Sequence, residues 1–187
     1  MNPPALARFG ERIVICGPSN SGKSTLAVAL GQKLGLPVVH LDLLHHLPNT
    51  DWVRRSPEEF QRLHDEAILG DGWVMDGNYS RLFPQRLARA TGIILLGDSR
   101  WANLRRYVRR TLFQRNRPGA LPGGNDTLKW AMIRWILVAG PRNIARYRAM
   151  LPEAGRPFVE IRSMRELKQL YFAWELLFDL QSERADA

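Results

Sequence analysis

The sequence predicts an α/β protein of three layers, in which a five-stranded parallel sheet lies between two layers of helices. Short runs of β-branched and apolar residues alternate along the chain with longer segments of helical periodicity, and this alternation is typical of parallel sheets. A glycine-rich turn joins the first apolar run to a helix. Several apolar runs end in a glycine or an acid, at the edge where such sheets bind ligands.

The predicted strands are short and almost wholly apolar, as expected of strands that are buried on both faces of a sheet. Ile13, Val14 and Ile15 form the first strand, which ends at Cys16. The other four strands are predicted over 38–41, 73–75, 92–96 and 158–161.

Helix signals lie between these strands. Ser56 and Pro57, followed by two glutamates, supply a capping hydroxyl, a proline in the first turn and acids at the positive end of the helix dipole. Gly140 and Pro141 should bend the longest helical segment. We predict helices over 25–34, 56–70, 81–90, 100–115, 127–150 and 163–180, and a loop over 43–52, with a helical start of that segment as the alternative.

Residues 17–24 fit the pattern G-x-x-x-x-G-K-[ST] of a phosphate-binding loop at every fixed position. Gly17 and Gly22 let the backbone turn tightly and bring its N–H groups close to phosphate oxygens. Lys23 would reach the terminal phosphates, and the Ser24 hydroxyl would bind Mg²⁺. The residues assigned to phosphate and nucleotide binding in this segment are Gly17, Pro18, Ser19, Asn20, Ser21, Gly22, Lys23, Ser24 and Thr25.

The composition is that of one globular domain. The chain has 187 residues, of which 45% are hydrophobic, enough for one well-buried core but not for two full domains. We therefore expect a single domain over 1–187. The single cysteine, Cys16, excludes an internal disulfide and fits a reducing compartment. No stretch has the length of a membrane span or the pattern of a signal peptide, so we expect a cytoplasmic monomer or homodimer.

The positive charge is concentrated in one block of the chain, although the net charge is only +9. Between Arg100 and Arg148 there are twelve Arg or Lys and one acid, Asp126, which gives a local charge of +11. The rest of the chain is slightly negative. Such a block binds anions, and phosphate, nucleic acid and a membrane surface are the candidates. The alternative is a solvated helix face.

Two acids follow predicted strands. Asp42 comes after the second strand and Asp76 after the third, so both should lie near Gly17 at one edge of the sheet. Asp42 is our candidate for orienting an acceptor hydroxyl or accepting its proton, and the alternative is a helix cap. Asp76 could instead be a turn residue before Gly77. His40 lies on the second strand, and no cysteine or second acid is spaced to complete a zinc site with it.

Four features together resemble a known family: the glycine loop, His40-Leu41-Asp42, the stretch WVMDGNY at 73–79, and a basic helix–loop–helix after Arg100. They are similar to P-loop kinases of the nucleoside-monophosphate-kinase, adenylate-kinase-like type, and most of all to bacterial kinase-like ATPases called DNA topology modulation proteins. The likeness covers roughly 13–161. It implies the three-layer α/β/α P-loop NTPase fold, ATP and Mg²⁺ as cofactors, and a helical lid over about 111–127.

The resemblance also implies roles for residues around the glycine loop. Lys23 and Ser24 match the phosphate-binding lysine and the magnesium-binding serine, and Asp76 matches the acid that organises Mg²⁺ through water. The chain departs from the family after Asp76, where Gly-Asn-Tyr-Ser-Arg81 stands in place of GFPR and displaces the acceptor-binding arginine. It also has Gly97 before Asp98 where relatives have an acid ending the fourth strand.

Four arginines of the basic block match arginines of the same family. Arg106 and Arg110, four residues apart on one helix face, resemble those that stack on adenine and touch phosphate. Arg115 and Arg117 resemble the lid arginines that act during phosphoryl transfer.

We therefore expect an ATP-dependent kinase that transfers the γ-phosphate of MgATP to a small-molecule or nucleotide acceptor, with Lys23, Mg²⁺ and the lid arginines neutralising the transferred group. The alternative is a nucleic-acid-associated P-loop ATPase whose basic block holds backbone phosphates. A lid is favoured because a nucleic-acid groove needs exposed aromatic residues. The aromatic residues of the block, which lie among apolar neighbours and are expected in the core, are Tyr107, Phe113, Trp130 and Trp135.

Overall fold

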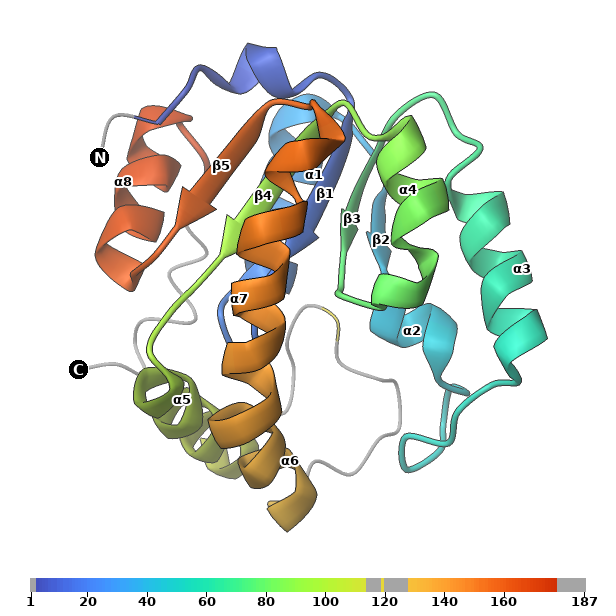
Figure 1. Ribbon diagram of the computed structural model, residues 1–187, viewed down its shortest axis with the longest axis vertical. Helices are drawn as coiled ribbons and strands as arrows, with labels where there is room; N and C mark the ends of the chain where they lie inside the picture. The colour runs from blue at the N-terminus through green and yellow to red at the C-terminus, as the bar shows by residue number, and fades with distance from the viewer. Residues whose placement is uncertain (1–2, 114–118, 120–127, 178–187) are drawn as a thin grey trace.

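The computed structural model describes residues 3–113, 119 and 128–177. Its centre is a five-stranded sheet of order β2-β3-β1-β4-β5 in which every pair of neighbours is parallel. The strands are β1 (Arg12–Cys16), β2 (Val38–His40), β3 (Trp73–Asp76), β4 (Gly92–Leu96) and β5 (Phe158–Ile161). Helices cover both faces (Figure 1), so the predicted three-layer α/β/α architecture is confirmed.

The helices fall close to the predicted segments. The first half of the chain contains α1 (Lys23–Leu34), α2 (Leu41–His45), α3 (Pro57–Ala67) and α4 (Phe83–Arg89), with short 3-10 turns η1 (Leu6–Phe9) and η2 (Ser80–Leu82). The second half contains α5 (Arg100–Phe113), α6 (Trp130–Arg134), the π-helical turn η3 (Trp135–Ala139), α7 (Gly140–Met150), the 3-10 turn η4 (Pro152–Ala154) and α8 (Met164–Ala173).

The two faces of the sheet bury separate cores because successive side chains of a strand point to opposite faces. On one face Ile13 and Ile15 of β1 pack in a cluster with residues of α1 and α8. On the other, Val14 and Cys16 pack with residues of α4 and α7. Burial raises the pKa of the Cys16 thiol to about 11, so this side chain is a protonated core residue at neutral pH.

Two helix starts follow directly from the sequence. Ser56 caps α3 by accepting a hydrogen bond from Glu59 N at 3.1 Å, with Pro57 in the first turn. Ser163 caps α8 in the same way, accepting from Glu166 N at 3.2 Å. These side chains satisfy backbone N–H groups that the first helical turn leaves without partners.

The segment predicted to bend at Gly140 and Pro141 runs from α6 through η3 into α7. Proline has no N–H for the helical ladder, and the backbone widens into a π turn immediately before it, where Gly140 N bonds Trp135 O. The irregularity therefore begins one turn earlier than the sequence predicts.

Three expectations need correction. β2 is an edge strand that β3 separates from β1, and it is only half-buried rather than buried on both faces as the sequence predicts. The last helix ends at Ala173, before the predicted boundary. Trp130 and Trp135 are 78% and 46% exposed rather than in the core, although Tyr107 is buried as expected.

None of the described helices is long and apolar enough to cross a membrane.

A fully buried histidine should make the fold sensitive to acid. His64 on α3 is 0% exposed. Burial lowers the pKa of its imidazole and the charge of Arg86 lowers it further, while the hydrogen bond that the Asp65 carboxylate accepts from the ring raises it. The unfolded chain therefore binds this proton at higher pH than the folded chain does. The unfolding free energy should therefore fall as the pH drops below about 6.5, the pKa of histidine in the unfolded chain. It should continue to fall until the pH reaches the lower pKa of His64 in the folded protein, by at most about 1.4 kcal/mol per pH unit.

The measurement is urea unfolding at several pH values between about 7.5 and 5. We expect His64→Leu to show a weaker dependence of the unfolding free energy on pH than the unsubstituted chain. Identical pH dependence in the two proteins would contradict this assignment, whatever their absolute stabilities.

Candidate active site

The glycine loop connects β1 to α1 with a backbone that only glycine tolerates at two points. Gly17 has φ +154°, and a Cβ there would lie 2.6 Å from Leu96 O. Gly22, with φ +88°, precedes the first turn of α1. The loop can therefore turn back over the helix N-terminus, where unpaired N–H groups and the helix dipole favour phosphate.

Buried donors in this loop fit a phosphate ligand. The Asn20 amide and the Ser21 hydroxyl are buried without a hydrogen-bond partner among the described residues, and such groups are costly to bury unpaired. Lys23 lies over the same loop, with Nζ donating to Pro18 O at 2.8 Å. The chemistry of these donors suits the phosphate chain of a nucleotide.

A second cluster lies where α1, β2 and β3 meet. Ser24 Oγ donates to Asp76 Oδ2 at 2.6 Å, and His40 Nδ1 lies 2.7 Å from Asp76 Oδ1. The sheet register places His40 opposite Asp76 at the ends of neighbouring strands. Asp76 is only 4% exposed. The serine hydroxyl and the buried carboxylate are oxygen donors of the kind Mg²⁺ prefers, so the cluster fits this ion.

The site predicted from the sequence lacks His40, because a single histidine on a strand indicates no set of metal ligands. Its contact with Asp76 depends on β2 lying directly beside β3. The sequence does hold one signal for this contact, because His40 and Asp76 both lie at the carboxyl ends of their strands.

One residue of the predicted lid segment also reaches this cluster. Gly119 has φ +72°, and a Cβ there would lie 2.9 Å from Ser24 Oγ and 3.5 Å from His40 Nδ1. Arg115 and Arg117 lie outside the described residues, as does the side chain of Arg110.

Asn78, which the sequence did not single out, ties the turn after β3 to the glycine loop. Its Oδ1 accepts from Gly17 N at 3.0 Å, and its Nδ2 donates to Gly17 O at 2.9 Å. Arg86 is fully buried and donates to Asn78 O at 2.6 Å. Its guanidinium carbon lies 4.8 Å from the centre of the Phe83 ring. The Asn78 side chain therefore fixes the position at which the loop begins to turn.

Arg106 extends from α5 to the other side of the glycine loop. Its Nε donates to Asn20 O at 2.7 Å. Its Nη2 pairs with Asp98 Oδ2 at 2.6 Å and donates to Asn103 Oδ1 at 2.6 Å. The structure thus brings Arg106 against the glycine loop, and Asp98, which follows β4, positions it there.

Asp42 lies in the first turn of α2 and accepts a hydrogen bond from Tyr79 OH at 2.5 Å. It does not cap the helix, because α2 begins at Leu41 without a side-chain cap. Burial and the neighbouring Asp42 carboxylate raise the pKa of Tyr79, so the phenol remains a donor. Tyr79 also packs against the rings of His45 and Phe60, with ring centres 4.8 and 4.9 Å away.

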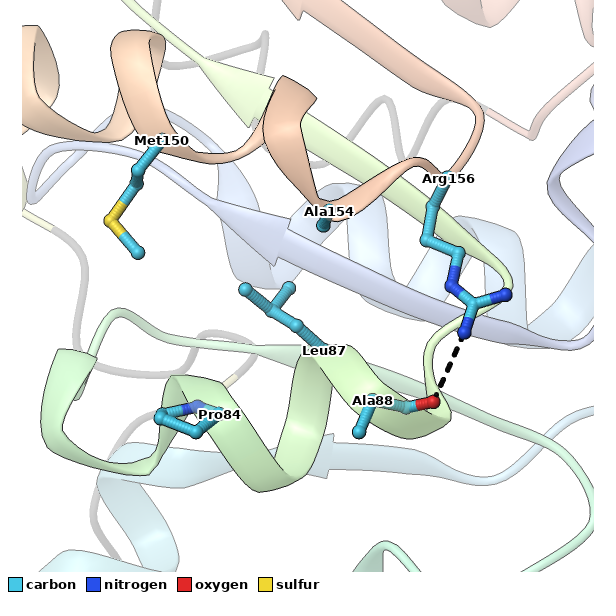
Figure 2. A pocket seen from close by; sticks show the side chains of 6 residues that line it. All are labelled: Pro84, Leu87, Ala88, Met150, Ala154 and Arg156. Carbon is cyan, nitrogen blue, oxygen red and sulfur yellow. Dashed lines mark hydrogen bonds between the residues drawn. The ribbon is translucent and has the colours of Figure 1, made fainter.

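These residues surround one edge of the sheet. In Figure 1 the strands point toward the lower part of the view, where α2, α5 and α6 lie. The cavity in Figure 2 is elsewhere: this groove of about 320 Å³ lies between α4 and the end of α7, and Arg156 closes one end by donating to Ala88 O at 3.2 Å. It contains none of the predicted site residues.

The chain has curated sequence relatives, although no protein-family model matches it. It is 31% identical over 169 residues to a tRNA dimethylallyltransferase of Streptomyces coelicolor, a match covering 83% of this chain and 53% of that protein. It is 30% identical over 165 residues to the enzyme of the same name from Streptomyces avermitilis, covering 84% and 51%. The chain thus spans about half the length of these relatives. Neither bears the name DNA topology modulation protein, so that part of the resemblance is unsupported.

Solved structures share the fold at low sequence identity. Shikimate kinase from Acinetobacter baumannii, in complex with shikimate, aligns with a TM-score of 0.51 and 16% identity over 92% of this chain and 98% of that chain. Shikimate kinase from Bacteroides thetaiotaomicron aligns with a TM-score of 0.50 and 16% identity over 89% and 99%. With its five-stranded parallel sheet and glycine loop, the chain has the fold of P-loop kinases.

Proposed function

We propose that this protein is an ATP-dependent phosphotransferase that transfers the γ-phosphate of MgATP to a small-molecule or nucleotide acceptor. The observation that carries the proposal is the pairing of buried, unpartnered donors in the glycine loop with the Ser24–Asp76 contact beside it. The first fits a phosphate chain and the second fits the cation that accompanies it.

The proposed roles follow from position. Lys23 and the loop N–H groups hold the β- and γ-phosphates, and Ser24 contacts Mg²⁺, which when bound neutralises phosphate charge. Asp76 orients Ser24 and the water around the cation. Arg106 holds the nucleotide side of the loop, and we assign Arg110, Arg115 and Arg117 to the nucleotide and lid as the family resemblance implies.

Asp42 has the position of an acceptor-side group in this proposal. Tyr79 holds its Oδ1, and the described residues offer no partner to Oδ2. A carboxylate oxygen held in this way can accept a hydroxyl proton or orient the hydroxyl for attack.

The protein acts as a monomer or homodimer in the cytoplasm under this proposal, with the 111–127 segment as lid of a single domain.

Thermal unfolding with Mg-nucleotide tests the proposal. A nucleotide that binds only the folded protein, at a concentration of about 100 times its dissociation constant, adds about 2.7 kcal/mol to the unfolding free energy. For a domain of this size that corresponds to a rise in Tm of about 5–10 °C. We expect this rise with MgATP, and screening hydroxyl compounds and nucleotides for faster ATP consumption identifies the acceptor.

Lys23→Ala should remove most of the rise in Tm, because the ammonium no longer faces the phosphates. Lys33→Ala is the matched control: it lies on the same helix, with Nζ paired to Glu175 at 3.0 Å on the surface. It should leave the nucleotide-dependent shift intact. The proposal fails if no Mg-nucleotide raises Tm in the folded protein.

A second candidate is transfer of a dimethylallyl group to RNA, the activity in the names of the sequence relatives. It is favoured by the length of the match, which extends over most of this chain. A glycine loop binds a diphosphate whatever group the diphosphate carries. Dimethylallyl diphosphate is therefore the probe: a larger rise in Tm with it than with MgATP would favour this candidate.

A further inference from the structure

The turn after β3 contacts both the glycine loop and Asp42. It consists of Gly77, Asn78 and Tyr79. The Asn78 side chain makes two hydrogen bonds with the backbone of Gly17, at 3.0 and 2.9 Å, and the Tyr79 hydroxyl donates to the Asp42 carboxylate at 2.5 Å. Adjacent residues of one turn therefore hold the first glycine of the loop and the acceptor-side acid, and a shift of the turn moves both contacts together.

The backbone of this turn needs support from its surroundings. Gly77 has φ +128°, where a Cβ would lie 2.9 Å from Leu41 Cβ, and Tyr79 has φ +32°. A non-glycine residue with positive φ is strained and persists only where the rest of the protein holds it. Gly77 N donates to Ile15 O at 3.1 Å, which fixes the start of the turn. Its middle and end need a second anchor.

Arg86 on α4 supplies that anchor from inside the protein. Its side chain is 0% exposed, and its Nη2 donates to Asn78 O at 2.6 Å. The guanidinium carbon lies 4.8 Å from the centre of the Phe83 ring, and this ring packs against the Tyr147 ring of α7 at 5.2 Å. Because both rings belong to the buried core, Arg86 ties the carbonyl of Asn78 to a fixed part of the fold.

The charge of Arg86 is poorly compensated for a buried group. Its Nε and Nη1 have no hydrogen-bond partner among the described residues, and no carboxylate of those residues forms an ion pair with it. Burial lowers the pKa of its guanidinium. A charge buried with so few partners costs free energy that an apolar side chain of similar size would not. Core packing alone therefore does not account for an arginine at this position, whereas its contact with Asn78 does.

We propose that Arg86 is a positioning residue that sets the spacing between the glycine loop and Asp42 through the turn at 77–79. The inference rests on the proposed function, in which the loop holds the phosphate donor and Asp42 meets the acceptor. Arg86 acts through Asn78 and Tyr79 and contacts neither substrate. Phosphoryl transfer depends on this spacing, since a misplacement of about 1 Å can reduce a rate by about 100-fold.

The first test measures positioning without any substrate. It follows amide hydrogen exchange by NMR in the ligand-free full chain at Gly17, whose N–H donates to Asn78 Oδ1, and at Ile93, whose N–H donates to Pro157 O in the sheet. Arg86→Met should raise the exchange rate of Gly17 by about 10- to 100-fold, the equivalent of one lost hydrogen bond from a charged donor. The rate of Ile93 reports global stability and should rise less.

The matched control is Arg89→Met. Arg89 lies on the same helix and also donates to a backbone carbonyl, that of Leu69 at 3.0 Å, so its loss should leave the Gly17 rate unchanged. Arg86→Gln, whose shorter amide does not reach Asn78 O, should raise the Gly17 rate as Arg86→Met does, and it replaces that variant if the methionine prevents folding. In an Asn78→Ala background, Arg86→Met should add little, because the acceptor of the Gly17 N–H is already gone.

The second test is acceptor-dependent turnover. Arg86→Met should lower kcat by about 10- to 100-fold, the usual cost of losing a residue that supports a site from outside it, and Arg89→Met should not. The inference is overturned if the folded Arg86 variants exchange Gly17 at the normal rate, if Ile93 exchange rises at least as much as that of Gly17, or if turnover is normal. A failure of the proposed function differs: the unsubstituted chain then shows no MgATP-dependent rise in Tm, while Gly17 exchange still shows whether Arg86 holds the turn.

Discussion

Asp42→Asn should reduce acceptor-dependent turnover by about 10²- to 10⁴-fold, the usual range for a lost acid–base group. The substitution keeps the shape of the side chain and an oxygen that can accept from Tyr79 OH, but it removes the basic carboxylate. MgATP should still raise Tm, and the slow hydrolysis of ATP without acceptor should change little. The measurement compares turnover with and without the acceptor identified by screening.

Tyr79→Phe separates catalysis from positioning. It removes the hydrogen bond and leaves the carboxylate, so it should cost far less turnover than Asp42→Asn. Asp71→Asn, at an exposed position after α3, is the control for loss of a surface carboxylate. Turnover in Asp42→Asn equal to that of the control would contradict a chemical role for Asp42.

The sequence predicted the sheet because its strands carry their own signal. The β-branched run at Ile13, Val14 and Ile15 and the run at 92–96 are buried on both faces and apolar throughout. The glycine loop was equally predictable, since its turn, its lysine and its helix start are adjacent in the chain and need no long-range contact.

The contacts around the loop could not be predicted in the same way, because they join residues that are distant in sequence. His40 and Asp76 meet only because β2 pairs with β3, and Asn78 reaches Gly17 across 61 residues. The helical pattern around Trp130 and Trp135 predicted a core, but periodicity alone does not say which face of a helix meets the protein. The structure leaves these two rings exposed.

Asp76→Asn should raise the Mg²⁺ concentration for half-maximal activity by about 10- to 100-fold, the usual effect of removing a group that orients a metal ligand. The carboxylate accepts from Ser24 Oγ and contacts His40 Nδ1, so the neutral amide orients both less well and no longer attracts the cation. High Mg²⁺ should restore part of the rate. The measurement is activity against free Mg²⁺ at fixed ATP.

Variants of Ser24 and Asp42 show whether this effect belongs to the cation. Ser24→Thr keeps the hydroxyl and should retain the Mg²⁺ dependence of the unsubstituted chain, while Ser24→Ala should shift it as Asp76→Asn does. Asp42→Asn should lower turnover at every Mg²⁺ concentration without moving the half-maximal point. If Asp76→Asn folds and its Mg²⁺ curve superimposes on that of the unsubstituted chain, Asp76 is a structural residue of the turn. In that case the cation must be held by Ser24 and the nucleotide without it.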